Sequence, residues 1–146
     1  MKHILLIEDN PSDIDLTRRA FDRERILNDL VVVDNGQAAL DYLFCTGPYA
    51  GRDPYDLPLL ILLDLNIPVV DGLEVLRQIR ANERTRRLLV IILTSSSEEQ
   101  DISASYDLHV NSYIRKPVDF QQFARVVKQL GMYWLVLNEP PQIPTS

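Results

Sequence analysis

The chain has 146 residues, of which 46% are hydrophobic, and this is enough apolar material for one compact domain without disulfides or structural metals. Its formal net charge of -6 argues against binding to nucleic acid or to an anionic membrane, because either would need a basic surface. It has one cysteine, no leader pattern and no apolar run near the roughly 20 residues of a membrane span, so we expect a protein of the reducing cytoplasm.

The first half of the chain alternates strand-like and helix-like patterns. The apolar run 4–7 stops at Glu8 and Asp9, as a strand does where it meets a loop, and Ser12 or Asp13 can cap the helix that follows. Further along we expect a strand at 30–33, a turn at 34–36, a helix over 38–44 and a long irregular segment at 46–58.

The second half continues the alternation around two continuous apolar runs, 59–63 and 88–93, which are typical of strands covered by helices on both faces. Helices are expected after Gly72, after the serines at 95–97 and after Pro117, with a fifth strand at 110–114. Five strands that alternate with five helices indicate an α/β fold with a parallel, doubly wound sheet. The five arginines between positions 77 and 87 are interpreted as a solvated helix end rather than a nucleic-acid patch.

Polar residues stand where the predicted strands end, and ligands of such sheets bind at that edge. They are Glu8 and Asp9, Asp64, Thr94 and Lys116. Three carboxylates in one pocket repel one another, so a cation is needed, and Mg²⁺ takes oxygen ligands while leaving room for phosphate oxygens. We therefore expect the three acids to hold Mg²⁺ and Asp64 to attack phosphorus, giving an acyl phosphate. Lys116 would pair with one phosphate oxygen and Thr94 would donate its hydroxyl to another.

Several short motifs occur together and in order at the ends of the right strands. They are Glu8-Asp9, Asp64, Pro68, Asp71-Gly72, Thr94-Ser95, Tyr113 and Lys116-Pro117. With this set the chain resembles the receiver domains of two-component response regulators, over about residues 2–130. The resemblance implies a flavodoxin-like sheet with strand order 2-1-3-4-5 and helices on both faces. It also implies Asp64 as the phosphoacceptor, the backbone carbonyl of Asn66 as a further metal ligand, and Thr94 with Tyr113 as the switch pair.

Within that family the chain is similar to the single-domain regulators that work beside bacterial and cyanobacterial phytochrome kinases. This narrower resemblance rests on the loop around Gly47, Tyr49, Arg52 and Pro58, the segment 62–66, Asp101-Ile102 with Ser105-Tyr106, the segment 116–120 and Tyr133-Trp134-Leu135. It implies a phosphoacceptor switch rather than an enzyme. The switch is expected to take phosphate from a histidine kinase of the phytochrome class, lose it by slow hydrolysis, and act on a downstream protein.

The chain divides into a predicted receiver domain, 1–130, and a C-terminal extension, 131–146. After Gly131 the extension has six apolar residues in a row, 132–137, which either fold back onto the domain or pack against a second copy. We expect a homodimer through this tail and the face of the fourth helix, fifth strand and fifth helix. The loop 46–58 either helps to recognise a kinase or merely lengthens a connection.

Other interpretations of these residues remain open. Taken alone, Glu8-Asp9 is a solvated turn, Tyr113 fills the core, and neither His3 nor His109 has an assigned function. An aspartyl-phosphate hydrolase would need a second acid where Asn66 stands, and a nucleotide-binding module would need a glycine-rich loop after the first strand. An adaptor that works without phosphate would have no reason to carry all the pocket residues.

Overall fold

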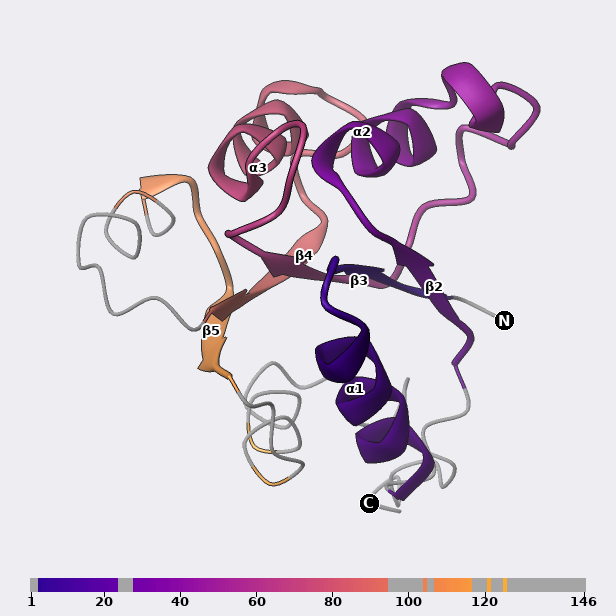
Figure 1. The fold of residues 1–146 in the computed structure, drawn as a ribbon. Helices are drawn as coiled ribbons and strands as arrows, with labels where there is room; N and C mark the ends of the chain where they lie inside the picture. The colour runs from indigo at the N-terminus through magenta and orange to yellow at the C-terminus, as the bar shows by residue number, and fades with distance from the viewer. Residues whose placement is uncertain are drawn as a thin grey trace, which may run out of the picture.

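The computed structural model describes residues 3–23, 28–94, 104, 107–116, 121 and 125. Within these residues, five parallel strands form one sheet in the order β2-β1-β3-β4-β5 (Figure 1). The strands are β1 (Ile4–Ile7), β2 (Leu30–Val33), β3 (Leu60–Asp64), β4 (Leu89–Thr94) and β5 (Ser112–Arg115). The predicted flavodoxin-like sheet and its strand order are therefore confirmed.

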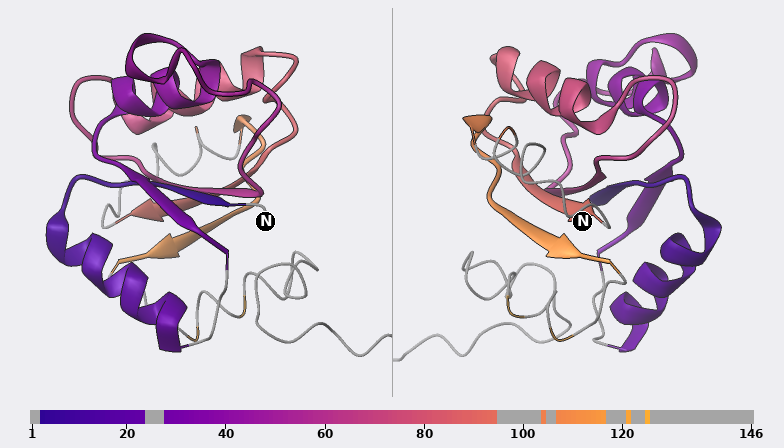
Figure 2. Two further views of the ribbon diagram at one scale, coloured as in Figure 1. Left: turned by 90° about the vertical axis from the view of Figure 1, so that its right-hand side faces the viewer. Right: turned by 60° about the vertical axis from the view of Figure 1, so that its left-hand side comes forward.

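The helices cover both faces of the sheet. Helix α1 (Pro11–Arg23) lies on one face, while α2 (Gly36–Phe44) and α3 (Gly72–Ala81) lie side by side on the other (Figures 1 and 2). Side chains along β1 alternate accordingly: Ile4 and Leu6 join the apolar cluster of Phe21 on α1, and Leu5 and Ile7 join that of α2 and α3. All four are fully buried, which explains why the central strands are apolar throughout.

The start of α1 differs from the prediction. Asn10 caps this helix, because its Oδ1 accepts hydrogen bonds from the backbone N–H groups of Ser12 (2.9 Å) and Asp13 (3.3 Å). Pro11 can occupy the first helical position, where a missing N–H costs nothing, so the helix starts before Ser12. The predicted cap at Ser12 or Asp13 was wrong, and the side chain of Asp13 is thereby available for another contact.

The caps of α2 and α3 also fix the loops beside the sheet edge. Asn35 Oδ1 accepts from the N–H of Ala38 (2.8 Å), so Gly36, predicted in a turn, is the first residue of α2. Asp71 Oδ1 accepts from the N–H of Glu74 (2.9 Å) at the start of α3. The first cap starts α2 soon after β2, and the second starts α3 at the end of the loop that follows β3.

The prediction that the arginine run is a solvated helix end was wrong for two of its members. The Arg80 guanidinium donates to four backbone carbonyls at the beginnings of β4 and β5, and Arg84 donates to the carbonyls of Leu43 and Pro54. The four carbonyls bound by Arg80 precede β4 and β5, that of Leu43 lies near the end of α2, and that of Pro54 lies in the loop 46–58. Arg77 alone among these three behaves as expected, in an exposed ion pair with Glu74.

The segment 46–58 is ordered around Tyr42. It contains a short 3-10 helix, Gly47–Tyr49, and the Arg52 guanidinium lies 3.6 Å from the centroid of the Tyr42 ring. The Tyr42 hydroxyl is 2.7 Å from Nε2 of the buried His3. His3 therefore has a structural contact at the amino ends of the strands, far from the acids that follow them.

Several predictions fall on residues that the structure does not describe. They concern the fourth and fifth predicted helices and the whole extension 131–146 with its dimer contacts. Of these two helices the structure describes only Ala104, Asp107, Gln121 and Arg125 as helical residues. Across the described part of the chain, no helix has the length and apolar character needed to cross a membrane.

Candidate functional site

The predicted site residues gather at the carboxyl ends of β1, β3 and β5. Ile7 pairs with Leu63 in the sheet, so Glu8, which follows β1, and Asp64, which ends β3, lie at the carboxyl ends of adjacent strands. Both are buried, with 1% and 3% of their surface exposed, whereas Asp9 is exposed. The topology thus brings together acids that are 56 positions apart in the chain, as the sequence predicted.

The three acids form a cluster with the chemistry of a cation site. Glu8, Asp9 and Asp64 each offer a carboxylate oxygen, and these oxygens all lie within 4.8 Å of one another. An all-oxygen set of carboxylates suits a hard divalent ion such as Mg²⁺. Two of the three are buried, and buried carboxylates need a counter-charge, so the residues present fit a bound divalent cation.

The Lys116 ammonium is the counter-charge that the structure places in this pocket. It follows β5 directly, its side chain is 9% exposed, and its Nζ is 2.8 Å from Asp64 Oδ2 and 2.9 Å from Asp13 Oδ2. It also contacts Glu8 Oε1. Burial on its own would lower the pKa of Lys116, but the hydrogen bonds to Asp64, Glu8 and Asp13 outweigh it and raise this pKa, so the ammonium stays charged.

Glu8 is held from its other side by the backbone. Its Oε2 accepts from the N–H groups of Asp9 (3.0 Å) and Asn10 (3.2 Å). Burial is the largest influence on this carboxyl, and together with the neighbouring Asp64 it raises the pKa of Glu8 to about 7 against the opposing effect of Lys116. Glu8 therefore titrates near neutral pH when no cation is present.

Asp64 is oriented by the loop that follows it. Its Oδ1 accepts from the N–H of Asn66 (2.9 Å), and its Oδ2 faces Lys116. Asn66, the predicted carbonyl ligand, is thus a close neighbour of Asp64, and its metal-binding role stays a prediction.

The loop between β3 and α3 is held by close backbone contacts. The N–H groups of Gly36 and Val70 both donate to Pro68 O, at 3.1 and 2.9 Å, and Val69, which lies between Pro68 and Val70, has a φ of 73°. Positive φ is unusual for a β-branched residue and costs about 1–3 kcal/mol, so it persists only where the surroundings enforce it. A Cβ on Gly72 would stand 2.5 Å from Asp64 O, which shows how closely the start of α3 approaches the backbone of Asp64.

The two predicted switch residues are placed in part. Thr94 ends β4, and its backbone pairs with Arg115 next to Lys116, while its side chain lies outside the described residues. Tyr113 in β5 is half-buried against the apolar cluster of α2 and α3. Tyr113 therefore packs against the core, as expected of an aromatic residue in a strand. Its role in a switch stays a prediction.

Asp13 was missed as a site residue. From the sequence, we expected Asp13 at the start of a helix, with at most a capping role. In the structure its carboxylate accepts a hydrogen bond from Lys116, which is 103 positions away in the chain. An acid in the first turn of a helix is usually explained by its favourable interaction with the helix dipole. The local sequence pattern therefore gives no signal of a pairing with Lys116.

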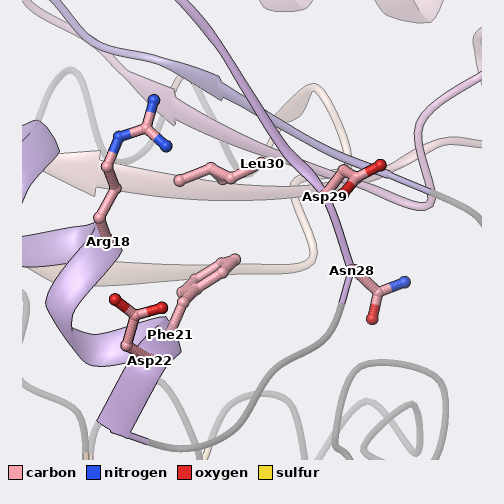
Figure 3. A pocket seen from close by; sticks show the side chains of 6 residues that line it. All are labelled: Arg18, Phe21, Asp22, Asn28, Asp29 and Leu30. Atoms are coloured by element: carbon pink, nitrogen blue, oxygen red, sulfur yellow. The ribbon is translucent and has the colours of Figure 1, made fainter.

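A pocket of about 220 Å³ lies away from the acidic cluster, between α1 and the chain that enters β2. It is lined by Arg18, Phe21, Asp22, Asn28, Asp29 and Leu30 (Figure 3). Leu30 begins β2, and the acids follow the strands, so this pocket is at the opposite edge of the parallel sheet. It has no part in the candidate site.

Comparison with known proteins points to one family. The family model of the response regulator receiver domain matches residues 4–128 of this chain. The chain is 43% identical over 138 residues to the probable methanogenesis regulatory protein FilR2 of Methanothrix harundinacea, a match that covers 94% of this chain and 86% of that protein. It is 38% identical over 134 residues to the response regulator Rcp1 of Synechocystis, covering 92% of this chain and 89% of Rcp1.

Solved structures agree with the sequence matches. The bacteriophytochrome response regulator RtBRR has a TM-score of 0.85 and 47% identity, covering 97% of this chain and 85% of that one. A structure of Rcp1 in its Mn²⁺-bound form has a TM-score of 0.78 and 37% identity, covering 97% of this chain and 99% of that one.

Proposed function

The chain belongs to the response regulator receiver domain family, and from this premise we propose that it accepts a phosphoryl group from a histidine kinase on Asp64, with Mg²⁺ bound. The observation that carries the proposal is the meeting of Asp64 with Lys116, at 2.8 Å, beside the acid cluster of Glu8 and Asp9. Phosphoryl transfer needs positioning and charge neutralisation above all, and this pocket offers both.

The residues would divide the work of phosphoryl transfer among them. A carboxylate oxygen of Asp64 attacks phosphorus, a new O–P bond forms, and the P–N bond to the kinase histidine breaks with its electron pair returning to the imidazole. Lys116 moves from carboxylates to a phosphate oxygen, and Thr94 donates its hydroxyl to another. Mg²⁺, held by Glu8, Asp9, Asp64 and the Asn66 carbonyl, would neutralise charge on the transferred group.

The protein would act as a switch and not as a turnover enzyme. A hydrolase would need a general acid two positions after the nucleophile, and this chain has the neutral side chain of Asn66 there. The backbone N–H of Asn66 donates to Asp64 Oδ1. Slow hydrolysis of the acyl phosphate then ends the signal. The phosphate would draw Thr94 towards it and let Tyr113 turn inward, which reshapes the surface that β5 and the last two predicted helices present to a downstream protein.

We further propose a phytochrome histidine kinase as the phosphodonor and the cytoplasm as the location. The similarity to Rcp1 and to the bacteriophytochrome regulator RtBRR, over most of each chain, supports the kinase class. FilR2, which is named for methanogenesis regulation, is a relative of similar identity. A direct test is phosphotransfer from a purified phytochrome kinase compared with an unrelated histidine kinase, where equal transfer from both would contradict the assignment.

The acceptor role itself is tested without any kinase. The protein and an Asp64→Asn variant are incubated with Mg²⁺ and acetyl phosphate, and the phosphoprotein is separated from unmodified protein. We expect base-labile labelling of the wild type only, and strong loss of labelling when Mg²⁺ is chelated. Asp53→Asn, at an exposed acid in the loop 46–58, serves as the matched control and should label normally. Equal labelling of wild type and Asp64→Asn would overturn the proposal.

A further inference from the structure

Asp13 is an acid of the pocket that lies outside the cation cluster. It stands on the first turn of α1, its side chain is 21% exposed, and its Oδ2 is 2.9 Å from Lys116 Nζ. The helix fixes its place, because the Asp13 N–H donates to Asn10 Oδ1 and the Asp13 carbonyl accepts from Thr17 Oγ1 at 2.9 Å. The contact with Lys116 therefore starts from a rigid element.

The three carboxylates on Lys116 are not equivalent. An ammonium has three N–H donors, and Asp64, Glu8 and Asp13 together provide an acceptor for each. Asp64 and Glu8 also belong to the cation cluster, whereas Asp13 does not. A cation in the cluster, or a phosphoryl group on Asp64, changes two of the three contacts of Lys116 and leaves the third in place.

We propose that Asp13 is a positioning residue of the phosphoryl site, which holds the Lys116 ammonium from the side of α1 while Asp64 and Glu8 engage the metal and the phosphoryl group. This inference rests on the proposed function. Lysine is a point charge at the end of a flexible four-carbon stem, so a fixed acceptor is what determines where the charge stands. Without Asp13 the ammonium would have to be repositioned in each transfer, which slows the reaction.

The test compares three variants in labelling by acetyl phosphate at saturating Mg²⁺. Asp13→Ala removes the acceptor and should slow labelling by about three- to tenfold. Asp13→Asn keeps an acceptor oxygen in the same place and should lose no more than about twofold. Asp15→Ala, two positions along the same helix, removes an exposed acid that pairs with Arg19, and should label at the wild-type rate.

The role through Lys116 is tested in a Lys116→Met background. There the addition of Asp13→Ala should cost nothing further, because the group that Asp13 positions is absent. An equal loss in both backgrounds would mean that Asp13 acts by another route. Labelling of Asp13→Ala at the wild-type rate would mean that Asp13 does not assist the transfer, and faster labelling would mean that its charge repels the donor. Each of these results would overturn the inference. Labelling that does not depend on Asp64 would instead overturn the proposed function.

A second readout needs neither metal nor phosphate and serves also if a variant is poorly active. Lys116 is one of three lysines in the chain, with Lys2 and Lys128 as internal references, so modification by an amine reagent can be followed peptide by peptide. In metal-free protein, Asp13→Ala should raise the relative rate of Lys116 modification severalfold, since one bond to the ammonium is lost. An unchanged rate would contradict the contact on which the inference depends.

Discussion

Lys116 is the residue on which the electrostatics of the pocket depend. Its ammonium contacts three carboxylates, two of which, Glu8 and Asp64, have almost no exposed surface. Removal of one partner of a buried ion pair is costly, because it leaves the other partner charged and desolvated. The lysine is thus important to the stability of the metal-free protein, apart from its role in the proposed phosphoryl transfer.

Lys116→Met should lower the free energy of unfolding of the metal-free protein by about 2–4 kcal/mol at a mildly alkaline pH, where the acids are ionised. The loss should shrink at acid pH, because the uncompensated carboxyls take up protons. Urea unfolding at both pH values measures this. Arg115→Met removes an exposed cation next to it and should change stability by no more than about 0.5 kcal/mol. Equal effects of the two substitutions would contradict the account.

Glu8 predicts how stability depends on pH. Its pKa in the folded protein is about 7, above the ordinary value of 4.5, so folding favours the protonated form. The stabilisation from that proton is complete below about pH 4.5 and is lost as the pH rises through about 7. Metal-free wild type should therefore lose stability over this range relative to Glu8→Gln, which does not titrate. Urea unfolding at several pH values tests the prediction, and parallel curves for the two proteins would refute it.

The sequence predicted most of the pocket at this scale because the carboxyl ends of parallel strands meet at one edge, and Glu8, Asp9, Asp64 and Lys116 each end or follow a strand. It did not predict the pairing of Asp13 with Lys116. That contact depends on where α1 begins, which Asn10 and Pro11 decide, and on a partner 103 positions away. The burial of the Glu8 side chain, and the raised pKa that results from it, depend on residues that pack around it from other elements, so the sequence alone does not predict them.

At the scale of elements, the packing of α3 against the end of β3 determines where Asp64 stands. A Cβ at Gly72 would lie 2.5 Å from Asp64 O and from Leu65 Cα, both backbone atoms that cannot move independently. Gly72→Ala should therefore cost about 1–3 kcal/mol of stability and slow labelling of Asp64. Gly51→Ala is the matched control, since no atom lies within 4 Å of its added Cβ. Urea unfolding and acetyl phosphate labelling of both variants measure the difference, and equal stability would refute the prediction.

Arg80 joins three elements at the opposite edge of the sheet. Its guanidinium donates to the carbonyls of Leu108 and His109 before β5, and to those of Arg86 and Leu88 before β4. A lysine cannot satisfy acceptors in so many directions, so Arg80→Lys should lower the free energy of unfolding by about 1–3 kcal/mol.

The control for this substitution is Arg77→Lys on the same helix. Arg77 forms an exposed ion pair with Glu74 at 3.0 Å, and such pairs contribute about 0.2–1 kcal/mol, of which a lysine keeps most. Thermal or urea unfolding of the two variants decides the matter. Similar losses in both would show that the carbonyl contacts of Arg80 contribute little.

Element bounds followed from the sequence where side-chain pattern alone decides them. The strands β1 and β2 have the predicted residues, and β3 and β4 each start and end one residue later than predicted. The fifth strand starts two residues later, at Ser112, because Asn111 uses its side chain and backbone to bind Val90. The arginine contacts were not predictable, since a run of arginines after a helix has the same pattern whether it faces solvent or carbonyls.

At the scale of the whole molecule, the predicted homodimer concerns the apolar segment 132–137. Sedimentation velocity should show a dimer, and Leu135→Glu, which places a charge in that segment, should shift it towards monomer while labelling of Asp64 is kept. Tyr55→Glu adds a charge at a site that is 82% exposed and should leave the dimer intact. A monomer at all concentrations, with and without phosphorylation, would contradict the prediction.

The central claim is that Asp64 is the phosphoacceptor, and the position of the phosphoryl group tests it most directly. Wild-type protein labelled by acetyl phosphate and Mg²⁺ can be reduced with borohydride, which converts an aspartyl phosphate to homoserine, and its peptides can be sequenced by mass spectrometry. The account predicts homoserine at position 64 and unmodified Glu8, Asp9 and Asp13. Reduction at another acid, or stable phosphate on a hydroxyl side chain with Asp64 intact, would contradict it.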